Sequence, residues 1–290
     1  MKPARFDYYD PRTFDEAVER LAGASGDAKV MAGGQSLLPL MNMRLVRPAV
    51  VVDINRVDGA DYLRPWNGGL AFGATVRQRR LEWDPLVAER LPILESAAKH
   101  IGHTQIRSRG TVCGSIAHAD PAAELPALAL ALDAELELHS LRGKRTVPAA
   151  DFFVDYLTTA LEPDEILVET RLRGSPPGMA WAFQEVSRRH GDFAMVGVVA
   201  GLAVQAGAIS DARLTYFGVG GTPVRSREVE AQLKGQAPGP DAFAAAAAAV
   251  QSLLDPSDDV HATAAYRRSV AGVLTQRALT EAWTQLRNPA

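Results

Sequence analysis

Cysteine is the scarcest residue in this sequence: Cys113 is the only one among 290 residues. A single cysteine cannot form a disulfide within the chain, and it cannot by itself hold an iron–sulfur cluster or a cysteine-rich zinc site. Redox chemistry in this protein would therefore need an organic cofactor, or clusters that another chain carries.

Long apolar runs and a large excess of one charge are also missing. The longest apolar runs, such as residues 193–204, fall short of the about 20 residues that cross a bilayer. The formal net charge of −3 gives no electrostatic reason to expect nucleic acid or an anionic membrane as partner. Residues 1–10 hold no apolar stretch after their early charges, so no secretory signal is predicted. We expect a cytoplasmic protein with no integral membrane segment and no nucleic-acid partner.

The composition is that of an ordinary globular protein, with 47% hydrophobic and 22% charged residues. A chain this long exceeds one small core, so two or three compact units are expected. In the first unit, residues 1–57, a capping Thr13 with Glu16 three residues later starts a helix. Two apolar segments, 29–32 and 50–54, predict strands. The pattern is typical of a small α/β subdomain.

The rest of the chain divides at residues 174–178, Gly-Ser-Pro-Pro-Gly, the strongest linker signal in the sequence. Before this segment, strand-like and helical pieces alternate, which predicts a second subdomain over residues 58–175. After it, three strand candidates precede two helices. Residues 176–290 are therefore predicted to form a three-stranded antiparallel sheet with packed helices, and the expected fold class is α+β.

The first glycine-rich segment, Gly33-Gly34-Gln35-Ser36, directly follows a predicted strand. Adjacent glycines permit positive φ and let a ligand approach the amides with no Cβ in the way. Successive N–H groups form a concavity that accepts anions, and Ser36 adds a hydroxyl donor. A diphosphate would suit this segment, and an ordinary turn is the alternative.

The second segment, residues 109–115, offers small residues, two hydroxyls and a turn. It leads to Asp120, which must be extended or in a turn because a proline follows. The alternative is a capped turn into a helix near residue 122. His118 fits either a contact behind a cofactor or a turn hydrogen bond, and Glu124 faces either cofactor or solvent. Two such segments, one in each subdomain, favour a dinucleotide-like ligand held between the subdomains.

Other chemistry has little support in the sequence. The glycines of residues 218–221 follow a strand, but Pro223 occupies the third glycine position of a nicotinamide-type motif, so a strand-end turn is predicted. His100 and His103 could share a helix face, but no carboxylate or cysteine completes a metal set. The serines of the two segments have no base nearby in the sequence, so no nucleophile is predicted.

Two long motifs and several shorter ones carry a family resemblance over almost the whole chain. The long motifs are residues 32–39 (AGGQSLLP) and 111–121 (TVCGSIAHADP), and the shorter ones are 163–167, 187–194 and 266–268. In order and spacing, the chain closely resembles the FAD-binding medium subunits of aerobic carbon monoxide dehydrogenase and related xanthine dehydrogenase-type molybdenum hydroxylases. The resemblance implies a vanillyl-alcohol-oxidase (PCMH-type) FAD-binding fold, with two α/β subdomains and a C-terminal sheet-and-helix domain.

The same resemblance implies the cofactor contacts. In the first loop, we expect the FAD to be held by Lys29, Val30, Met31, Ala32, Gly33, Gly34, Gln35, Ser36 and Leu37. In the second loop, we expect it to be held by Thr111, Val112, Cys113, Gly114 and Ser115. Along the adenosine, ribityl or ring parts we expect Ile101, Asp120, Glu124 and Leu167, with His118 behind them. At the isoalloxazine we expect Gln184 and Phe193.

Three positions depart from the family pattern. Cys113 stands where a second glycine is expected, so its backbone must adopt negative φ or accept strain. Gln35 replaces a histidine and keeps a hydrogen-bond donor. Gln184 replaces the lysine of several relatives, which removes a positive charge from the expected flavin ring and disfavours NAD as acceptor.

The function that the resemblance implies is electron transfer. In such complexes a large subunit with a molybdenum cofactor oxidises the substrate, and a small subunit with two [2Fe-2S] clusters relays single electrons. FAD in the medium subunit passes the electrons to an external acceptor. We therefore expect an oxidoreductase subunit with no catalytic or metal-ligating residues of its own, in a dimer of heterotrimers. Two rivals are a self-sufficient FAD-dependent reductase or oxidase on the same fold, and a scaffold that retains the fold without FAD.

Overall fold

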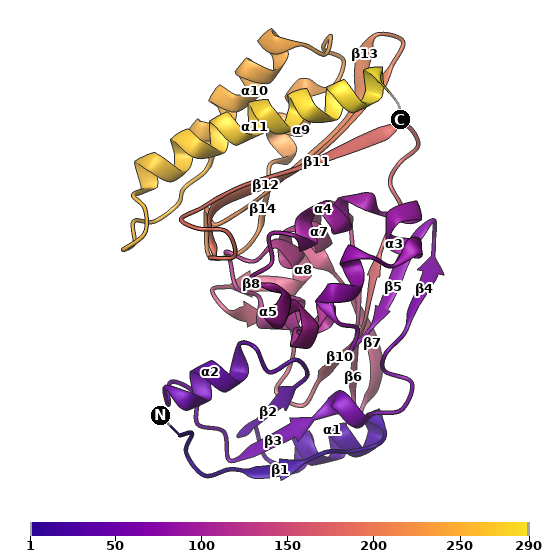
Figure 1. Ribbon diagram of the computed structural model, residues 1–290, viewed down its shortest axis with the longest axis vertical. Helices are drawn as coiled ribbons and strands as arrows, with labels where there is room; N and C mark the ends of the chain where they lie inside the picture. Colours follow the sequence, from indigo (N-terminus) through magenta and orange to yellow (C-terminus); the bar gives the residue numbers. More distant parts are fainter. Residues whose placement is uncertain (1, 289–290) are drawn as a thin grey trace.

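The computed structural model describes residues 2–288 as three units stacked along the long axis of the molecule (Figure 1). The chain runs from the N-terminal unit at the bottom of the view, through the middle unit, to the C-terminal unit at the top. Helices and strands occur in all three units, as the predicted α+β class requires. Among residues 2–288, no helix is long and apolar enough to cross a membrane.

The N-terminal unit is built on a small parallel sheet. Its elements are β1 (Asp7–Tyr9), α1 (Phe14–Gly23), β2 (Ala28–Met31), α2 (Leu37–Asn42), β3 (Val50–Asp53) and the short 3-10 helix η1 (Ile54–Arg56). The strand order is β1-β3-β2. Thr13 begins α1 by accepting a hydrogen bond from the Glu16 N–H, which confirms the predicted cap. Ile166 and Val168 from the middle unit complete the core under α1, so the two units share apolar contacts.

The middle unit holds a five-stranded antiparallel sheet in the order β4-β5-β10-β6-β7. Its elements are β4 (Leu63–Trp66), β5 (Gly69–Gly73), η2 (Gln78–Glu82), α3 (Pro85–Arg90), α4 (Pro92–Ala98), α5 (Thr104–Arg109), α6 (Val112–His118), α7 (Glu124–Ala131), β6 (Glu135–Ser140), β7 (Gly143–Pro148), α8 (Ala149–Phe152), β8 (Phe153–Asp155), β9 (Thr158–Thr159) and β10 (Ile166–Leu172). Strand β10, the last element of the middle unit in chain order, lies at the centre of the sheet. The sheet of the middle unit is therefore complete only when this C-terminal strand has paired with β5 and β6.

The C-terminal unit is an antiparallel sheet covered on one face by helices (Figure 1). Its elements are β11 (Met179–Ser187), β12 (Ala194–Gln205), β13 (Ala208–Phe217), β14 (Val224–Arg225), α9 (Arg227–Leu233), α10 (Pro240–Leu253) and α11 (Ala264–Arg287). The two-residue strand β14 adds a fourth strand to the three that the sequence predicts, because a segment so short shows no alternation. Residues 173–178 form no helix or strand, and we retain 1–57, 58–175 and 176–290 as a proposed division.

Alternation along the strands of the C-terminal sheet decides which core each side chain joins. Phe183 packs into the core of the middle unit, whereas its neighbour Ala182 packs under the helices. Helix α7 lies against β12 and β13, and every one of its residues is buried. A helix that is apolar on all sides is expected to be buried on all sides. The Gly218 N–H at the end of β13 also donates to the Pro121 carbonyl oxygen at 2.7 Å, which ties the sheet to the end of the second glycine-rich segment.

Candidate functional site

Gly33 is the point where the two glycine-rich loops meet. A Cβ built on Gly33 would lie 2.5 Å from the Arg109 carbonyl oxygen and 2.7 Å from the Gly110 Cα. These neighbours are backbone atoms, so the first loop packs backbone to backbone against the second. A Cβ built on Gly114 would lie 3.8 Å from the Cβ of Ala32. The structure therefore brings together two segments that lie far apart in the sequence, one from each subdomain.

An arginine and an asparagine join the two loops. The Arg77 guanidinium donates to the Arg109 carbonyl oxygen at 2.6 Å and to Asn55 Oδ1 at 2.6 Å. Asn55 Nδ2 donates in turn to the Ala32 carbonyl oxygen at 2.6 Å. We call Arg77 and Asn55 the loop brace. Neither residue stands out in the sequence, because no local pattern links the end of β3 to a residue after β5.

The first loop leaves polar groups free for a ligand. Gly34 has φ of +71°, in the left-handed region that favours glycine. Gln35 Nε2 donates to the Gly33 carbonyl oxygen at 3.2 Å, so this side chain shapes the loop. Ser36 precedes α2, is exposed, and does not use its side chain to cap the helix. Lys29 is exposed on β2, at the start of the loop.

The second loop is more constrained than the first. Thr111 Oγ1 accepts a hydrogen bond from the Gly114 N–H at 3.0 Å, and the Val112 N–H donates to the Val76 carbonyl oxygen at 2.9 Å. A Cβ on Gly114 would lie 2.5 Å from Thr111 Oγ1, so this cap requires glycine. These two amides are therefore used inside the protein. Half-buried Ser115 is the hydroxyl that this loop offers to a ligand.

Cys113 faces the core and not the loops. It lies in α6 and is not among the residues with positive φ, so a cysteine in place of the expected glycine causes no backbone strain. Its Sγ lies 3.2 Å from Thr170 Oγ1, and burial raises the pKa of the thiol to about 12. The helical turn that presents Gly114 to the first loop directs the Cys113 side chain toward the sheet, and a contact of the Cys113 backbone with the cofactor stays a prediction.

The residues expected along the rest of the cofactor lie at the surface between the middle and C-terminal units or in the middle core. Ile101, Glu124 and Leu167 are buried, with 7%, 7% and 4% of their surface exposed. Asp120 accepts a hydrogen bond from the Ala122 N–H at 2.9 Å in the turn before α7. His118 ends α6, where burial lowers its pKa. Their contacts with a cofactor stay predictions.

The side chain of Gln184 lies on the helix side of β11. Its Nε2 donates to Glu281 Oε2 on α11 at 2.6 Å, so the side chain points to the helix layer. The alternation of β11 turns the next residue, Glu185, toward the middle unit instead, and only 2% of its side chain is exposed. The contact of Gln184 with the isoalloxazine stays a prediction. Phe193, 70% exposed, lies in the turn between β11 and β12.

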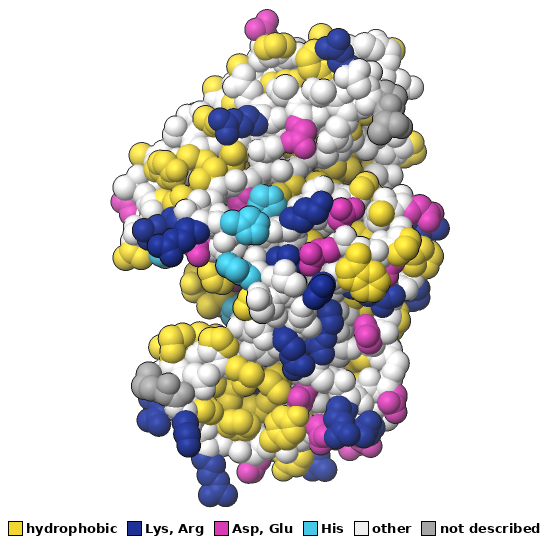
Figure 2. Space-filling model, viewed as in Figure 1, with side chains coloured by type: hydrophobic (Ala, Val, Ile, Leu, Met, Phe, Trp, Pro, Cys, Tyr) yellow, Lys and Arg dark blue, Asp and Glu magenta, His cyan; other side chains and the backbone are white. Residues whose placement is uncertain are grey.

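Histidine side chains gather at the junction of the middle and C-terminal units (Figure 2). The His103 and His190 rings are 6.5 Å apart, and the His100 ring lies 5.0 Å from that of Phe183. Groups of three or more histidine, cysteine, aspartate or glutamate residues that could hold a metal ion are absent from the part of the chain that the structure describes. His190, in the turn of residues 188–193, thus lies near His103 at the start of α5, and Phe183 of β11 packs against His100 after α4.

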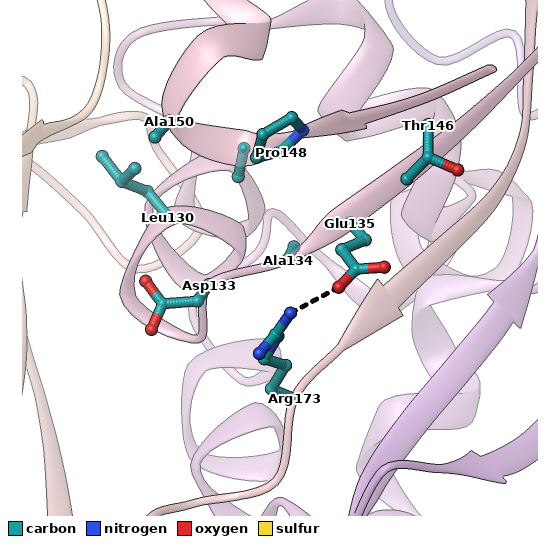
Figure 3. Close-up of a pocket in the computed structure, with 9 residues that line it drawn as sticks. Leu130, Asp133, Ala134, Glu135, Thr146, Pro148, Ala150 and Arg173 are labelled. Atoms are coloured by element: carbon teal, nitrogen blue, oxygen red, sulfur yellow. Dashed lines mark hydrogen bonds and ion pairs between the residues drawn. The ribbon is translucent and has the colours of Figure 1, made fainter.

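A surface cavity of about 320 Å³ lies away from both loops (Figure 3). It is lined by residues of α7, β6, β7 and the end of β10. Arg173 donates to Glu135 Oε1 across it at 2.5 Å. No residue of either glycine-rich loop lines the cavity. An elongated dinucleotide suits the surface that the loops share better than this separate cavity.

Two family matches divide the chain between them. A family described as the FAD binding domain in molybdopterin dehydrogenase matches residues 4–172. A second, the CO dehydrogenase flavoprotein C-terminal domain, matches residues 181–282. The chain belongs to the FAD-binding medium subunits of the molybdenum hydroxylases. The family, the fold and the oxidoreductase class that the sequence predicts are thereby confirmed.

Relatives of this medium subunit match it over nearly their full length. It is 42% identical to the 6-hydroxypseudooxynicotine dehydrogenase complex subunit alpha of Paenarthrobacter nicotinovorans, over 97% of this chain and 96% of that one. It is 36% identical to the carbon monoxide dehydrogenase medium chain of Hydrogenophaga pseudoflava, over 98% and 99%. Carbon monoxide dehydrogenase from Hydrogenophaga pseudoflava superposes with a TM-score of 0.95, covering 98% of this chain and 99% of that chain at 38% identity. Quinoline 2-oxidoreductase from Pseudomonas putida 86 gives 0.94 at 36% identity, with 99% of each chain covered.

Proposed function

We propose that this medium subunit carries FAD and transfers electrons from the [2Fe-2S] clusters of a partner subunit to an external acceptor. The contact of Gly33 with the backbone of Arg109 and Gly110 carries the proposal. It joins the two loops into one surface with free hydroxyls and no Cβ atoms at the point of contact. Bound FAD exchanges electrons singly or in pairs, and so connects one-electron clusters to a two-electron acceptor.

The residues of the two loops fit a diphosphate. Positive φ at Gly34 exposes backbone toward the ligand side, and the Ser36 hydroxyl is not used for capping. Arg77 and Arg109 add positive charge beside the loops, and the pKa of Arg77 is lowered by burial and by the nearby Arg109. An anion would relieve that repulsion between two guanidinium groups. The remaining contacts assigned to Ile101, Asp120, Glu124, Leu167, His118 and Phe193 form part of this proposal.

The proposal places the substrate chemistry in other subunits. Cys113 is buried and its thiol stays protonated, so it cannot ligate a cluster. Relatives at 36–42% identity are named for carbon monoxide, for caffeine and for a nicotine derivative. One fold thus serves different substrates, which we infer are bound by a large molybdenum subunit. A small iron–sulfur subunit completes the heterotrimer, and we infer that two heterotrimers pair in the cytoplasm.

Two measurements test the proposal. The purified chain should contain about one FAD per chain, and acid precipitation should release all of the yellow colour because neither loop resembles a covalent flavin attachment site. FMN, or flavin retained in the pellet, would contradict it.

Co-expression separates the electron-transfer subunit from a self-sufficient flavoenzyme. The chain is produced with and without the small- and large-subunit genes, and flavin reduction by candidate substrates is followed anaerobically. Reduction only in the full complex is expected. Rapid bleaching of the isolated chain by a substrate would favour the self-sufficient enzyme, and a purified chain that takes up no FAD would favour a scaffold.

A further inference from the structure

Asp53 is a buried carboxylate at the end of β3, at the level where the first loop begins. In the parallel register of β2 and β3 it lies opposite Met31, the last residue of β2. Only 8% of its surface is exposed. Among residues 2–288, the hydrogen bonds that it accepts come from Tyr8 and Asn55, whose side chains are neutral. A buried carboxylate needs several such donors, because burial removes the water that would otherwise solvate it.

Asp53 accepts three hydrogen bonds, and two of them come from Asn55. Its Oδ1 atom accepts from the Asn55 N–H at 2.9 Å and from Asn55 Nδ2 at 2.5 Å. Its Oδ2 atom accepts from the Tyr8 hydroxyl at 2.7 Å. Hydrogen bonds to an ionised acceptor are stronger than those between neutral groups. One carboxylate therefore holds both the backbone and the side chain of Asn55, which is a member of the loop brace.

The Asn55 side chain can complete the loop brace in one orientation only. Its Nδ2 atom donates to the Ala32 carbonyl oxygen and to Asp53 Oδ1, and neither oxygen has a proton to donate. Its Oδ1 atom accepts from the Arg77 guanidinium, which can only donate. Exchanging the two ends of the amide would set oxygen against oxygen, and N–H groups against the guanidinium. The brace therefore depends on whatever keeps the amide nitrogen turned toward the first loop.

Asp53 can hold this orientation before the middle unit is in place. Arg77 directly precedes η2 in the middle unit, so it reaches Asn55 only when the two units have come together. Asp53 lies two residues from Asn55 in the same segment, so their contact is local. A side chain that is already fixed loses less conformational entropy when a further contact forms. The carboxylate therefore prepares the amide for the contact with Arg77.

Capping of η1 alone does not account for these contacts. The bond from the Asn55 N–H to Asp53 is the cap of η1. Thr13 and Thr263 cap α1 and α11 with one hydroxyl each, so a cap in this chain needs one acceptor and no charge. The bond from Asn55 Nδ2 adds nothing to the backbone of η1. It fixes the side chain that joins the first loop to Arg77.

We propose that Asp53 is a positioning residue of the FAD site and acts on the cofactor through Asn55. It keeps the amide nitrogen on the first loop and the amide oxygen on Arg77. Arg77 in turn donates to the Arg109 carbonyl oxygen of the second loop at 2.6 Å. The spacing of the two loops, which the FAD diphosphate must fit, is thereby fixed from behind the first loop. The inference rests on the proposed function, because it concerns the same site.

Two substitutions of Asp53 separate the cap from the positioning role. Asp53→Ser keeps a hydroxyl that can cap η1 but is too short to hold the Asn55 amide as well, whereas Asp53→Asn keeps an oxygen in reach of both. FAD is titrated into the FAD-free full-length chain, with thermal unfolding of the same samples. Asp53→Ser should weaken FAD binding by about five- to tenfold, and Asp53→Asn should stay within about threefold of wild type. The matched control Asp58→Ser, at an exposed acid after η1, should bind FAD like wild type.

A double-mutant cycle tests whether Asp53 acts through Asn55. In the Asn55→Ala background, Asp53→Ser should cause no further loss of FAD affinity, because the amide that Asp53 holds is gone. The same factor of loss in both backgrounds, or wild-type affinity of Asp53→Ser alone, would overturn the positioning role and leave the proposed function standing. Equal losses in Asp53→Ser and Asp53→Asn would also overturn it, because only the second keeps the acceptor. A wild-type chain that binds no FAD would overturn the proposed function itself.

Discussion

Replacing Gly33 with alanine tests whether contact between the two loops creates the FAD site. The new Cβ would lie 2.5 Å from the Arg109 carbonyl oxygen, whereas ordinary contact begins at 3.4 Å, so the loops must separate by nearly an ångström. Neither neighbour is a side chain that could rotate away. Overpacking of this kind costs about 1–3 kcal/mol. If that free energy is lost from FAD binding, the affinity should fall about 5–150-fold.

The assay is titration of the FAD-free chain with FAD, followed by quenching of flavin fluorescence, with thermal unfolding of the same samples. The matched control is Gly23→Ala, because a Cβ on Gly23 meets nothing within 4 Å and the residue lies in α1. The control should bind FAD like wild type and unfold at the same temperature or slightly higher. Gly33→Val, with a β-branched side chain, should abolish binding. Wild-type affinity in both Gly33 variants would show that the loop contact is structural and that FAD binds elsewhere.

Three further predictions follow from the positions of single side chains. Arg77→Met removes the two hydrogen bonds that Arg77 donates in the loop brace and should weaken FAD binding by about tenfold, or ~1.4 kcal/mol. Arg79→Met, at an exposed neighbour, should bind FAD like wild type, and wild-type affinity of Arg77→Met in the same titration would refute the brace. Burial raises the pKa of Cys113 to about 12, so its thiol is protonated at pH 8 and should react with iodoacetamide only after unfolding. Rapid labelling of the folded chain, detected by mass spectrometry, would contradict the burial of Cys113. Gln184→Lys should leave the flavin midpoint potential unchanged, because the new ammonium would pair with Glu281 on the helix side of β11. A raised midpoint potential would instead place the side chain at the flavin.

Much of the fold follows from local patterns. Thr13 and Glu16 mark the start of α1, the six alanines of residues 244–249 lie inside α10, and the apolar runs near residues 194 and 214 lie in β12 and β13. Each of these signals depends on neighbours within a few residues. Such local signals therefore predict where individual helices, strands and the loops between them lie.

Pairing over long sequence distances does not follow from those patterns. Strand β10 lies between β5 and β6, and nothing local to residues 166–172 selects those two partners. The face of a strand is equally hard to predict where both faces are buried. Ala182 and Phe183 are both apolar, and a shift of one residue exchanges the helix side for the middle unit. Gln184 and Glu185 are neighbours on opposite faces of β11, and the sequence does not show which of the two faces the middle unit.

The loop brace shows why a motif locates a site without defining it. The glycines of the first loop mark where a cofactor can approach the backbone, but their position against the second loop depends on Arg77 and Asn55. Asn55 reaches Ala32 and Arg77 reaches Arg109, so each side chain spans from one element to the backbone of another. Such contacts exist only once three segments have folded together. Substitutions at Arg77 should therefore alter FAD binding without altering either glycine motif, and for that reason the brace belongs to the site as much as the loops do.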